Sequence, residues 1–327
     1  MRIAQAGLFC SIKKDLEVLE TLLLESVKSD IPLVTEIGTH LVNSGGKRLR
    51  PALLLTAAHA GKGFSRERLM PLAAAIEMIH MASLVHDDVI DNSDTRRGTP
   101  TANAKWGNQV AILSGDYFFA QAFSLVANEH YGEEVSIRLA KLVSELSVGE
   151  IQQDALMFTS EHNIQEYYQR IEKKTANFLA ICCELGGMVS GAEEAVCKSL
   201  YDYGHCIGMA FQITDDLLDI TGDSKKLGKP AAGNDIRQGV VTLPVIRALE
   251  TSPQRDELSA IITNRGMNDA DVSRALEIVR ATDGVDFAKQ KADEFLSNAK
   301  ATLHGDIPKE VRDTFIEAAD YIGKRDF

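Results

Sequence analysis

Apolar residues recur along most of the chain at the three- and four-residue intervals that are typical of amphipathic helices. The spacing is clearest in EEVSIRLAKLVSELSVGEIQQ, in IQEYYQRIEKKTANFLAICCELGG and in AKQKADEFLSNAKATL. The alternation of β-branched residues that is typical of strands is nearly absent. The pattern therefore predicts an all-α protein, and because no Pro- or Ser-rich linker interrupts it, we expect a single domain over residues 1–327.

Capping residues and prolines mark where helices should begin. Asn163 followed by Glu166 has the spacing of a capping box. Ser252 before Pro253 reads as an N-cap with proline at the first helical position. Pro71 is expected to open a long apolar helix.

Two segments, 71–91 and 200–220, are apolar nearly all round and should form central helices. In the second segment Gly204 and Gly208 are one helical turn apart, which permits close approach of another backbone. Each ends in a cluster of aspartates with the spacing DDxxD, namely Asp87, Asp88 and Asp91 in the first and Asp215, Asp216 and Asp219 in the second. The first and last aspartate of each cluster lie one helical turn apart on the same face. Like charges at the ends of buried helices need protonation or cations to compensate them.

The chemistry of these clusters favours a hard cation, since only carboxylate oxygens are on offer. Mg²⁺ suits this best, because it takes few protein oxygens together with waters and substrate phosphates. A single DDxxD is more often a solvated helix end, but two copies on two buried helices make that reading weak. A di-iron carboxylate site needs two ExxH pairs, and the chain has one, from Glu77 to His80.

Charge and cysteine usage narrow the function further. The chain has 35 Lys and Arg against 47 Asp and Glu, a formal net charge of −12, which argues against general nucleic-acid binding. Its 5 cysteines form no paired framework, so a reducing cytoplasm is the expected location. No apolar run is long enough for a transmembrane helix. An anionic ligand would therefore need local basic clusters or metal ions.

Such basic clusters lie beside the aspartates. GGKRLRP at 45–51 places its cations at the start of a helix, where free backbone N–H groups and the helix dipole also attract anions. Arg96 and Arg97 follow the first aspartate cluster, Lys173 and Lys174 lie within a helix, and Lys229 follows the second cluster. Each alone is an ordinary surface feature. Together with the aspartates and the apolar helices they indicate a ligand with a diphosphate and a hydrocarbon tail.

These segments resemble the trans-prenyltransferases, and most closely the long-chain polyprenyl diphosphate synthases of the hepta-, octa- and decaprenyl type. The matching motifs occur in family order, as GGKRLRP (45–51), HDDVIDNSDTRRG (86–98), GEIQQ (149–153), KTA (174–176), FQITDDLLD (211–219) and LGKP (227–230). The resemblance implies an isoprenoid-synthase-type helical bundle around a deep central cavity. It also implies a homodimer and, as the common destination of the product, a quinone side chain.

The resemblance also assigns roles to residues. Direct metal ligands are expected to be Asp87, Asp91 and Asp215, with Asp88, Asp216 and Asp219 in support. Positions that match contacts to the allylic substrate are Arg96, Lys174, Thr175, Gln212 and Lys229, and Lys174 is also expected to be catalytic. Positions that match the isopentenyl diphosphate site are Lys47, Arg50, His80 and Arg97. After LGKP the chain reads AAGNDIRQG where the family often reads AGGDLRQG, so the role of Asp235 stays open.

The implied reaction is the Mg²⁺-dependent condensation of isopentenyl diphosphate onto an allylic diphosphate such as farnesyl diphosphate. The allylic C–O bond ionises, the isopentenyl double bond attacks the cation, and a proton is lost. Two rivals stay open. A terpene cyclase of the same fold would not need the GGKRLRP segment, and a non-catalytic partner subunit would typically have lost an aspartate motif.

Small residues before the first aspartate cluster predict a long product. Ala82 and Ser83 lie one turn before Asp87, and Ile79 lies on the next turn. In short-chain relatives an aromatic residue blocks the tail near these positions. A helix of about 24 residues is roughly 36 Å long, which suggests an octaprenyl product, with Phe119 or Phe123 as candidates for the floor. We expect a long product to leave through peripheral contact with a membrane.

Overall fold

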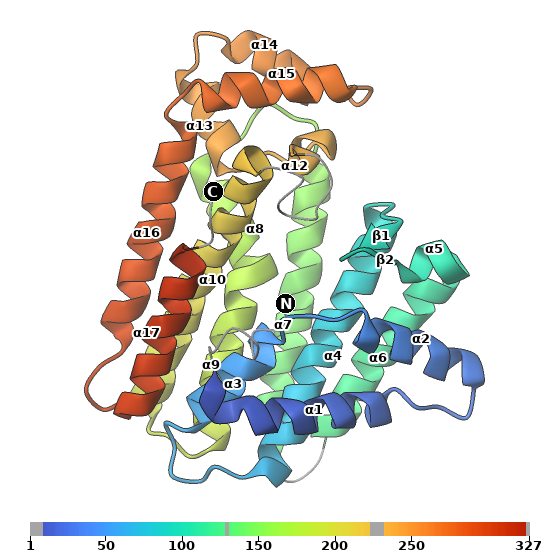
Figure 1. Cartoon of the computed structure of the whole chain (residues 1–327), viewed down its shortest axis with the longest axis vertical. Coiled ribbons are helices and arrows are strands. Elements are labelled where there is room, and N and C mark those ends of the chain that lie inside the picture. Colours follow the sequence, from blue (N-terminus) through green and yellow to red (C-terminus); the bar gives the residue numbers. More distant parts are fainter. Residues whose placement is uncertain (1–8, 128–130, 223–231, 325–327) are drawn as a thin grey trace. The chain divides into compact units, whose positions relative to one another are not determined.

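The computed structural model describes residues 9–127, 131–222 and 232–324 (Figure 1). The regular elements among these residues are helices, apart from one short antiparallel hairpin. In the hairpin Thr95 pairs with Pro100 and Arg96 with Thr99. The prediction of an all-α fold is confirmed, although the hairpin was not predicted. The described residues divide into two compact units, and α7, α9, α10 and α17 have residues in both. Whether the units act as one domain stays a prediction.

The first unit takes its residues from Met1–Val143, Leu179–Asp202 and Leu303–Glu317. Its complete elements are η2 (Cys10–Ile12), α1 (Lys13–Ser26), α2 (Pro32–Asn43), α3 (Leu49–Ala58), α4 (Arg66–Ile90), β1 (Thr95–Arg96), β2 (Thr99–Pro100), α5 (Ala102–Trp106) and α6 (Asn108–Val126). It also contains the first part of α7 (Gly132–Leu156), most of α9 (Asn177–Val189), and the first parts of α10 (Glu194–Thr221) and α17 (Lys309–Gly323).

Helix α4 is the core of this unit. It packs against α1, α3 and α6, and α6 runs beside it along most of its length (Figure 1). Among the described helices it is the one long and apolar enough to cross a membrane, yet 72% of its most apolar window is buried in the protein. Burial of this kind is what a central helix of a folded core requires. The sequence was therefore right about the position of this helix.

The start of α4 corrects one prediction. The helix begins at Arg66, so Pro71 lies inside it and not at its beginning. A proline there lacks the N–H that the interior of a helix uses. The prediction failed because the apolar run begins one turn after the helix itself.

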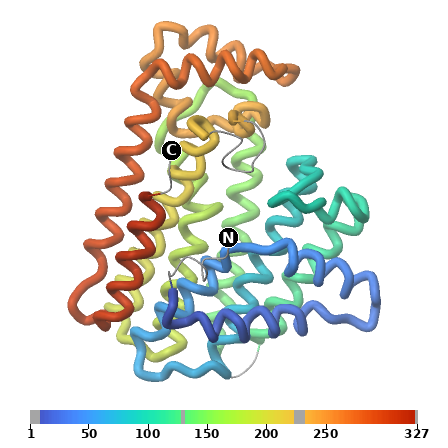
Figure 2. The backbone as a smooth tube through the Cα atoms, in the orientation of Figure 1, coloured from blue at the N-terminus to red at the C-terminus, as the bar shows by residue number. Residues whose placement is uncertain are grey.

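The second unit takes its residues from Ser144–Phe178, Tyr203–Thr302 and Ala318–Phe327. Besides the remaining parts of the shared helices it contains α8 (Ile164–Ile171), the π-helical turn η3 (Glu172–Ala176), α12 (Asn234–Arg237), α13 (Leu243–Thr251), α14 (Arg255–Ile262), α15 (Asp269–Arg280) and α16 (Gly284–Thr302). Figure 2 traces the chain through α13, α14 and α15, which pack on one another. Their apolar faces and the later part of α10 share one buried cluster.

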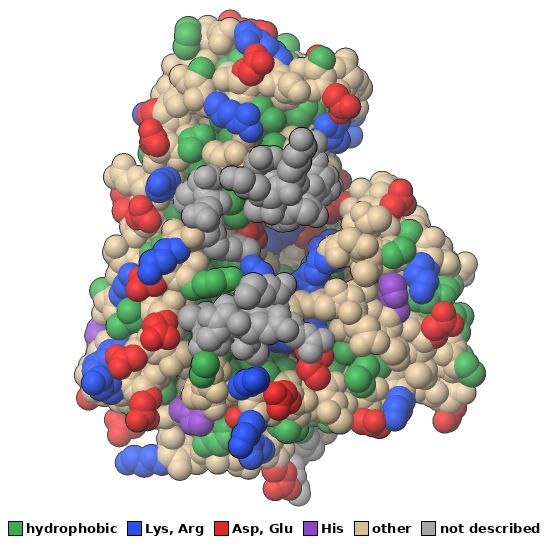
Figure 3. All heavy atoms as spheres, in the orientation of Figure 1, with side chains coloured by type: hydrophobic (Ala, Val, Ile, Leu, Met, Phe, Trp, Pro, Cys, Tyr) green, Lys and Arg blue, Asp and Glu red, His purple; other side chains and the backbone are tan. Residues whose placement is uncertain are grey.

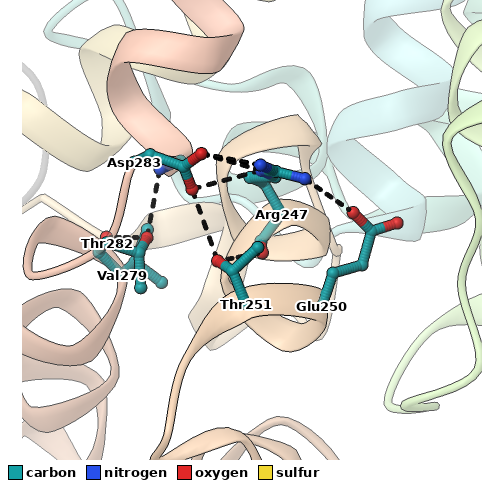
Figure 4. Close-up of polar contacts among 7 residues, drawn as sticks. Arg247, Glu250, Thr251, Val279, Thr282 and Asp283 are labelled. Carbon is teal, nitrogen blue, oxygen red and sulfur yellow. Dashed lines mark hydrogen bonds and ion pairs between the residues drawn. The ribbon is translucent and has the colours of Figure 1, made fainter.

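Polar contacts fasten α13 to the start of α16 in this unit. Arg247 Nη2 donates to Asp283 Oδ2 across 2.7 Å, and Thr251 and Glu250 also take part (Figure 4). The hydrogen bonds hold the pKa of Asp283 below its usual range. These side chains are exposed, so packing of α13 on α16 contributes more to this junction than the ion pair does.

The two predicted helix starts in this unit fared differently. Asn163 is the N-cap of α8, and its side chain accepts the Glu166 N–H across 2.8 Å. Ser252 ends α13 instead of capping the next helix, because its hydroxyl accepts the Gln254 N–H in a turn and α14 begins only at Arg255. A serine before a proline fits both a cap and a turn, so the sequence alone did not separate them.

Candidate active site

The first aspartate cluster closes the C-terminal end of α4. Asp88 is buried, with 4% of its surface exposed, and its Oδ1 accepts from both Arg96 Nε and Arg96 Nη2 across 2.8 Å. Burial raises the pKa of Asp88, and the Arg96 guanidinium opposes that rise. Asp87 is half-buried and Asp91 is exposed. The two outer carboxylates of the motif are therefore on the accessible part of the helix end, whereas the middle one is used inside the protein.

The two arginines of the RRG segment point to different partners. Arg96 ends β1, and Arg97 lies in the turn between β1 and β2, where Arg97 and Gly98 have positive φ values of 54° and 78°. Arg96 binds the first aspartate motif, as described above, whereas Arg97 Nη1 donates to the backbone carbonyl of Gly45. The turn thus joins the first aspartate motif to the GGKRLRP loop within the first unit.

The GGKRLRP loop leads directly into α3. Arg48 is the N-cap residue in the left-handed conformation, and the Gly46 backbone lies so close to two guanidiniums that a Cβ there would be 2.9 Å from Arg97 Nη1 and 3.2 Å from Arg48 Nη1. Burial lowers the pKa values of Arg50 and Arg97, and neighbouring positive charges lower them further, Arg97 acting on Arg50 and Arg96 acting on Arg97. A dense positive cluster of this kind suits an anionic ligand.

His80 lies on α4, in the same cluster. Burial is the main cause that lowers the pKa of His80 well below its usual range, and the positive charges of Arg50, Arg97, Arg96 and Arg48 add to it. The imidazole is therefore neutral at physiological pH when no anion is bound. Burial and the neighbouring arginines thus both keep His80 uncharged.

The second aspartate cluster lies on α10 in the second unit. Asp216 is buried, and its two oxygens accept from Tyr167 Oη across 2.7 Å and from Gln212 Nε2 across 2.8 Å. Thr175 Oγ1 donates in turn to Gln212 Oε1 across 2.8 Å. Burial raises the pKa of Asp216 to about 6, although both hydrogen bonds oppose that rise. As in the first cluster, the middle aspartate is held by the protein itself.

The outer aspartates of the second cluster differ from each other. Asp215 is half-buried on α10. Asp219 accepts the backbone N–H groups of Asn234 and Asp235, each across 3.1 Å, at the start of α12. The carboxylate of Asp219 thus caps α12 and anchors the backbone of the AAGNDIRQG segment. Asp235, whose role the sequence left open, supplies one of these N–H groups.

The KTA motif is presented by a π-helical turn, η3, between α8 and α9. Such a turn inserts an extra residue into a helix and is frequent at functional sites. The sequence predicted an ordinary helix here. Gly208 permits this geometry on one side, since a Cβ there would be 2.5 Å from Ala176 Cα. The approach of α10 that its glycines were expected to allow is therefore real at Gly208.

The GEIQQ motif, to which sequence reasoning gave no role, holds the lysines of η3. Lys174 Nζ lies 2.5 Å from Glu150 Oε1 and donates to Gln153 Oε1 across 3.0 Å. Lys173 Nζ donates to Gln152 Oε1 across 2.9 Å. Gly149 allows the close approach, since a Cβ there would be 2.9 Å from Lys174 Cγ. The two motifs therefore form one structure in which the position of Lys174 is set by GEIQQ.

The remaining predicted residues are placed as follows. Lys47 and Ser83 are half-buried, and Ile79 and Ala82 are fully buried in α4. The ring of Phe119 lies beside that of His86, tilted by 55° with ring centroids 5.7 Å apart, and its role at the floor of a tail site stays a prediction. Lys229 lies outside the described residues. Tyr167 is a contributor that sequence reasoning missed, and Gly149 belongs to GEIQQ, a motif that the sequence analysis quoted without a role.

The carboxylates fit Mg²⁺ better than a metal that needs a complete protein cage. Among the residues that the structure describes, no three His, Cys, Asp or Glu side chains come together as a ready metal site. The accessible carboxylates instead offer single oxygens at helix ends, and Mg²⁺ takes one or two protein carboxylates together with waters and substrate phosphates. Over the visible face, Lys and Arg side chains are interspersed with Asp and Glu (Figure 3).

Comparison with known proteins agrees with these motifs. The sequence model of the family "Polyprenyl synthetase" matches residues 31–279. The chain is 40% identical to heptaprenyl diphosphate synthase component 2 of Geobacillus stearothermophilus, over 98% of this chain and 99% of the relative. It is 38% identical to nonaprenyl diphosphate synthase of Mycobacterium tuberculosis, over 81% and 78% of the two chains. The structure of a decaprenyl diphosphate synthase from Rhodobacter capsulatus superposes with a TM-score of 0.90, at 34% identity and over 99% of this chain and 98% of that one.

The family match spans most of the chain and includes all six motifs, with both aspartate clusters among them. The relatives share the fold over nearly their whole length. The chain belongs to the polyprenyl synthetase family and is a prenyltransferase.

Proposed function

We propose that this chain is a long-chain trans-polyprenyl diphosphate synthase, which adds isopentenyl diphosphate repeatedly to an allylic diphosphate such as farnesyl diphosphate. One observation carries the proposal. Each aspartate motif has its middle carboxylate held inside the protein, by Arg96 in one and by Tyr167 in the other, while Asp87 and Asp215 are half-buried on the same two helices. A structural salt-bridge cluster would have no reason to repeat that division on two helices.

We assign the Asp87 motif of the first unit, and the Asp215 motif and Lys174 of the second unit, to Mg²⁺ and the allylic diphosphate. Mg²⁺, when bound, neutralises the diphosphate and stabilises the charge that builds on it as the C–O bond breaks. Lys174, already oriented by Glu150, would donate hydrogen bonds to the leaving diphosphate oxygens. Isopentenyl diphosphate would bind separately, at Lys47, Arg50, His80 and Arg97. A terpene cyclase has no use for this second basic cluster, in which the positive charge of Arg97 lowers the pKa of Arg50.

The long product is supported by the small residues on α4 before Asp87. Ser83 is half-buried and donates its hydroxyl to the His80 carbonyl across 2.9 Å, so it puts no bulk into the space beside it. The hepta-, nona- and decaprenyl names of the relatives support a tail in the same range. Octaprenyl diphosphate is the product that we propose, with a deep apolar cavity to hold it.

We further propose a homodimer. Apolar side chains are exposed along one face of α7, where Ile137, Val148 and Ile151 show 62%, 41% and 70% of their surface. Ile112 and Leu113 on α6 are also exposed, by 44% and 60%. Exposed apolar surface of this extent marks an interaction site. The name "component 2" of one relative raises the alternative of a different second subunit.

Light scattering on the purified chain tests the homodimer. The wild type should give twice the chain mass, and Ile151→Lys should give the monomer mass. A monomeric wild type contradicts the proposal.

The proposed function is tested with the purified single chain, farnesyl diphosphate and excess isopentenyl diphosphate. We expect product with Mg²⁺ and none in excess chelator, with activity restored when Mg²⁺ is added back. Asp87→Ala and Asp215→Ala should each lose turnover by several orders of magnitude, because each removes a group that holds transition-state charge. Full activity in chelator would refute the metal proposal, and no product under any condition would favour the partner-subunit reading.

A further inference from the structure

All three nitrogens of the Arg48 guanidinium, in the GGKRLRP loop, donate hydrogen bonds to acceptors within the protein. Nη1 donates to Glu77 Oε1 across 2.8 Å, Nε donates to Glu20 Oε1 across 2.9 Å, and Nη2 donates to Glu20 Oε2 across 3.2 Å and to the Val42 carbonyl across 3.0 Å. Its side chain is 4% exposed. Such a group cannot bind a ligand without first breaking these contacts.

The partners of Arg48 come from three different helices. Glu20 lies on α1, Val42 lies in the last turn of α2, and Glu77 lies on α4. Arg48 itself is the N-cap of α3. A planar fork with several fixed donors can hold three acceptors in one arrangement, which a lysine cannot. The guanidinium therefore fixes the start of α3 relative to three neighbouring helices of the same unit.

The backbone of Arg48 adopts a conformation that these side-chain contacts help to maintain. Arg48 has a φ of 50°, in the left-handed region that a non-glycine residue rarely adopts. A strained residue of this kind persists only where the surrounding structure determines it. Its neighbour Lys47 and the first-turn residue Arg50 are the two loop cations assigned to isopentenyl diphosphate, so the position of both follows from the conformation of Arg48.

Glu77 extends the same connection to the rest of that site. It lies three residues before His80 on α4, almost on the same face of the helix. Its negative charge also raises the pKa values of Arg50 and Arg97, which burial lowers. One buried carboxylate thus holds Arg48 directly and helps two neighbouring arginines to stay charged.

We propose that Arg48, clamped by Glu20 and Glu77, is a positioning residue for isopentenyl diphosphate: it sets Lys47 and Arg50 on the loop against His80 on α4. This inference rests on the proposed function and on the assignment of those residues to isopentenyl diphosphate. Arg48 itself touches no substrate. Loss of Arg48 should therefore weaken the binding of isopentenyl diphosphate and leave the binding of the allylic diphosphate nearly unchanged.

The test measures KM for each substrate, kcat and melting temperature in Arg48→Lys and Glu20→Ala. Arg48→Lys keeps the charge but loses the fork, and we expect the isopentenyl KM to rise roughly tenfold, the effect of one misplaced charge-assisted hydrogen bond. The farnesyl diphosphate KM should change less than about twofold. Glu20 is partly exposed, with 21% of its side chain accessible, so Glu20→Ala should fold and shift the isopentenyl KM in the same direction by a smaller factor.

Arg138→Lys is the matched control. Arg138 also bridges two glutamates, Glu134 and Glu184, across 2.8 and 2.7 Å, but it lies outside every motif. It should leave both KM values unchanged. If Arg48→Lys and Glu20→Ala lower only the melting temperature, or raise both KM values equally, Arg48 is merely structural and the inference is wrong, while wild-type turnover keeps the proposed function intact. A wild type without turnover overturns both.

Discussion

The Tyr167 hydroxyl donates a hydrogen bond to Asp216 Oδ2 across 2.7 Å, deep in the second unit. Gln212, one turn earlier on α10, occupies the other oxygen. The pair orients the whole second aspartate motif, because fixing Asp216 on the inner face of α10 determines where its neighbour Asp215 points. Arg96 does the same for Asp88 on α4. Each motif is thus built around one carboxylate that faces the protein.

The first prediction concerns this hydrogen bond. Tyr167→Phe leaves one oxygen of the buried Asp216 without its donor, so the free energy of unfolding should fall by about 1.5–3 kcal/mol. Turnover should fall as well, because Asp215 loses its fixed orientation. Urea unfolding and initial rates measure the two effects. Tyr131→Phe, which removes a hydroxyl that donates to a backbone carbonyl, is the control and should leave turnover unchanged. Unchanged turnover in Tyr167→Phe would show that this contact does not serve the motif.

A second prediction concerns the approach of GEIQQ to η3. In Gly149→Ala the new Cβ would lie 2.9 Å from Lys174 Cγ and 3.2 Å from Lys173 Cβ, so Lys174 must move. We expect the KM for the allylic diphosphate to rise about tenfold, with little change in the isopentenyl KM. Gly305→Ala, where no atom lies within 4 Å of the added Cβ, is the control. Equal rises in both KM values would show that Lys174 does not act specifically on the allylic diphosphate.

A third prediction concerns acid stability. The pKa of His80 is lower in the folded protein than in the unfolded chain, where it is about 6.5. Below that pH, His80 is therefore protonated in the unfolded chain but stays neutral in the folded protein. The stability contribution is complete above that value and is lost as the pH falls below it, by up to about 1.4 kcal/mol per pH unit. Urea unfolding of wild type and His80→Gln at pH 7.5 and 5.5 isolates the effect.

The wild type should lose more stability than His80→Gln between these two pH values. Raised pKa values at Asp88 and Asp216 act in the opposite direction, but they are common to both proteins and cancel in the comparison. The same loss in both proteins would mean that His80 titrates normally.

A fourth prediction concerns chain length. Ser83→Phe adds bulk one turn before Asp87 at a half-buried position, so it should shorten the product towards farnesyl or geranylgeranyl length while the first condensation continues. Ala82→Phe is less informative than its sequence position suggests, because Ala82 is fully buried and a larger side chain would disturb the packing of α4. Ser273→Phe, at an exposed position on α15, is the control. Full-length product from Ser83→Phe would exclude this path for the tail.

Much of the fold could be predicted because helix periodicity is a local property. The central position of α4, the N-cap at Asn163 and the close approach at Gly208 followed from neighbouring residues alone. Ser252 failed as a cap because a turn and a helix start use the same residue types. The hairpin at Thr95–Pro100 was missed because two-residue strands have no periodicity to detect.

Within the candidate site, the sequence indicated residue types but not their partners. It singled out both aspartate motifs, yet it could not tell that Asp88 and Asp216 face the protein, since that depends on Arg96 and Tyr167 from other segments. The π-helical turn at KTA and the neutral state of His80 likewise arise from packing against distant residues. Long-range contacts of this kind are absent from local patterns.

The most direct measurement is the length of the product made by the purified single chain with Mg²⁺, farnesyl diphosphate and excess isopentenyl diphosphate. The products are dephosphorylated and separated by chain length beside prenyl alcohol standards. We predict a distribution centred on octaprenyl, one or two units wide, from the wild-type chain without any added subunit. A chain that stops at farnesyl or geranylgeranyl length, or that makes product only when a second protein is added, would contradict this account.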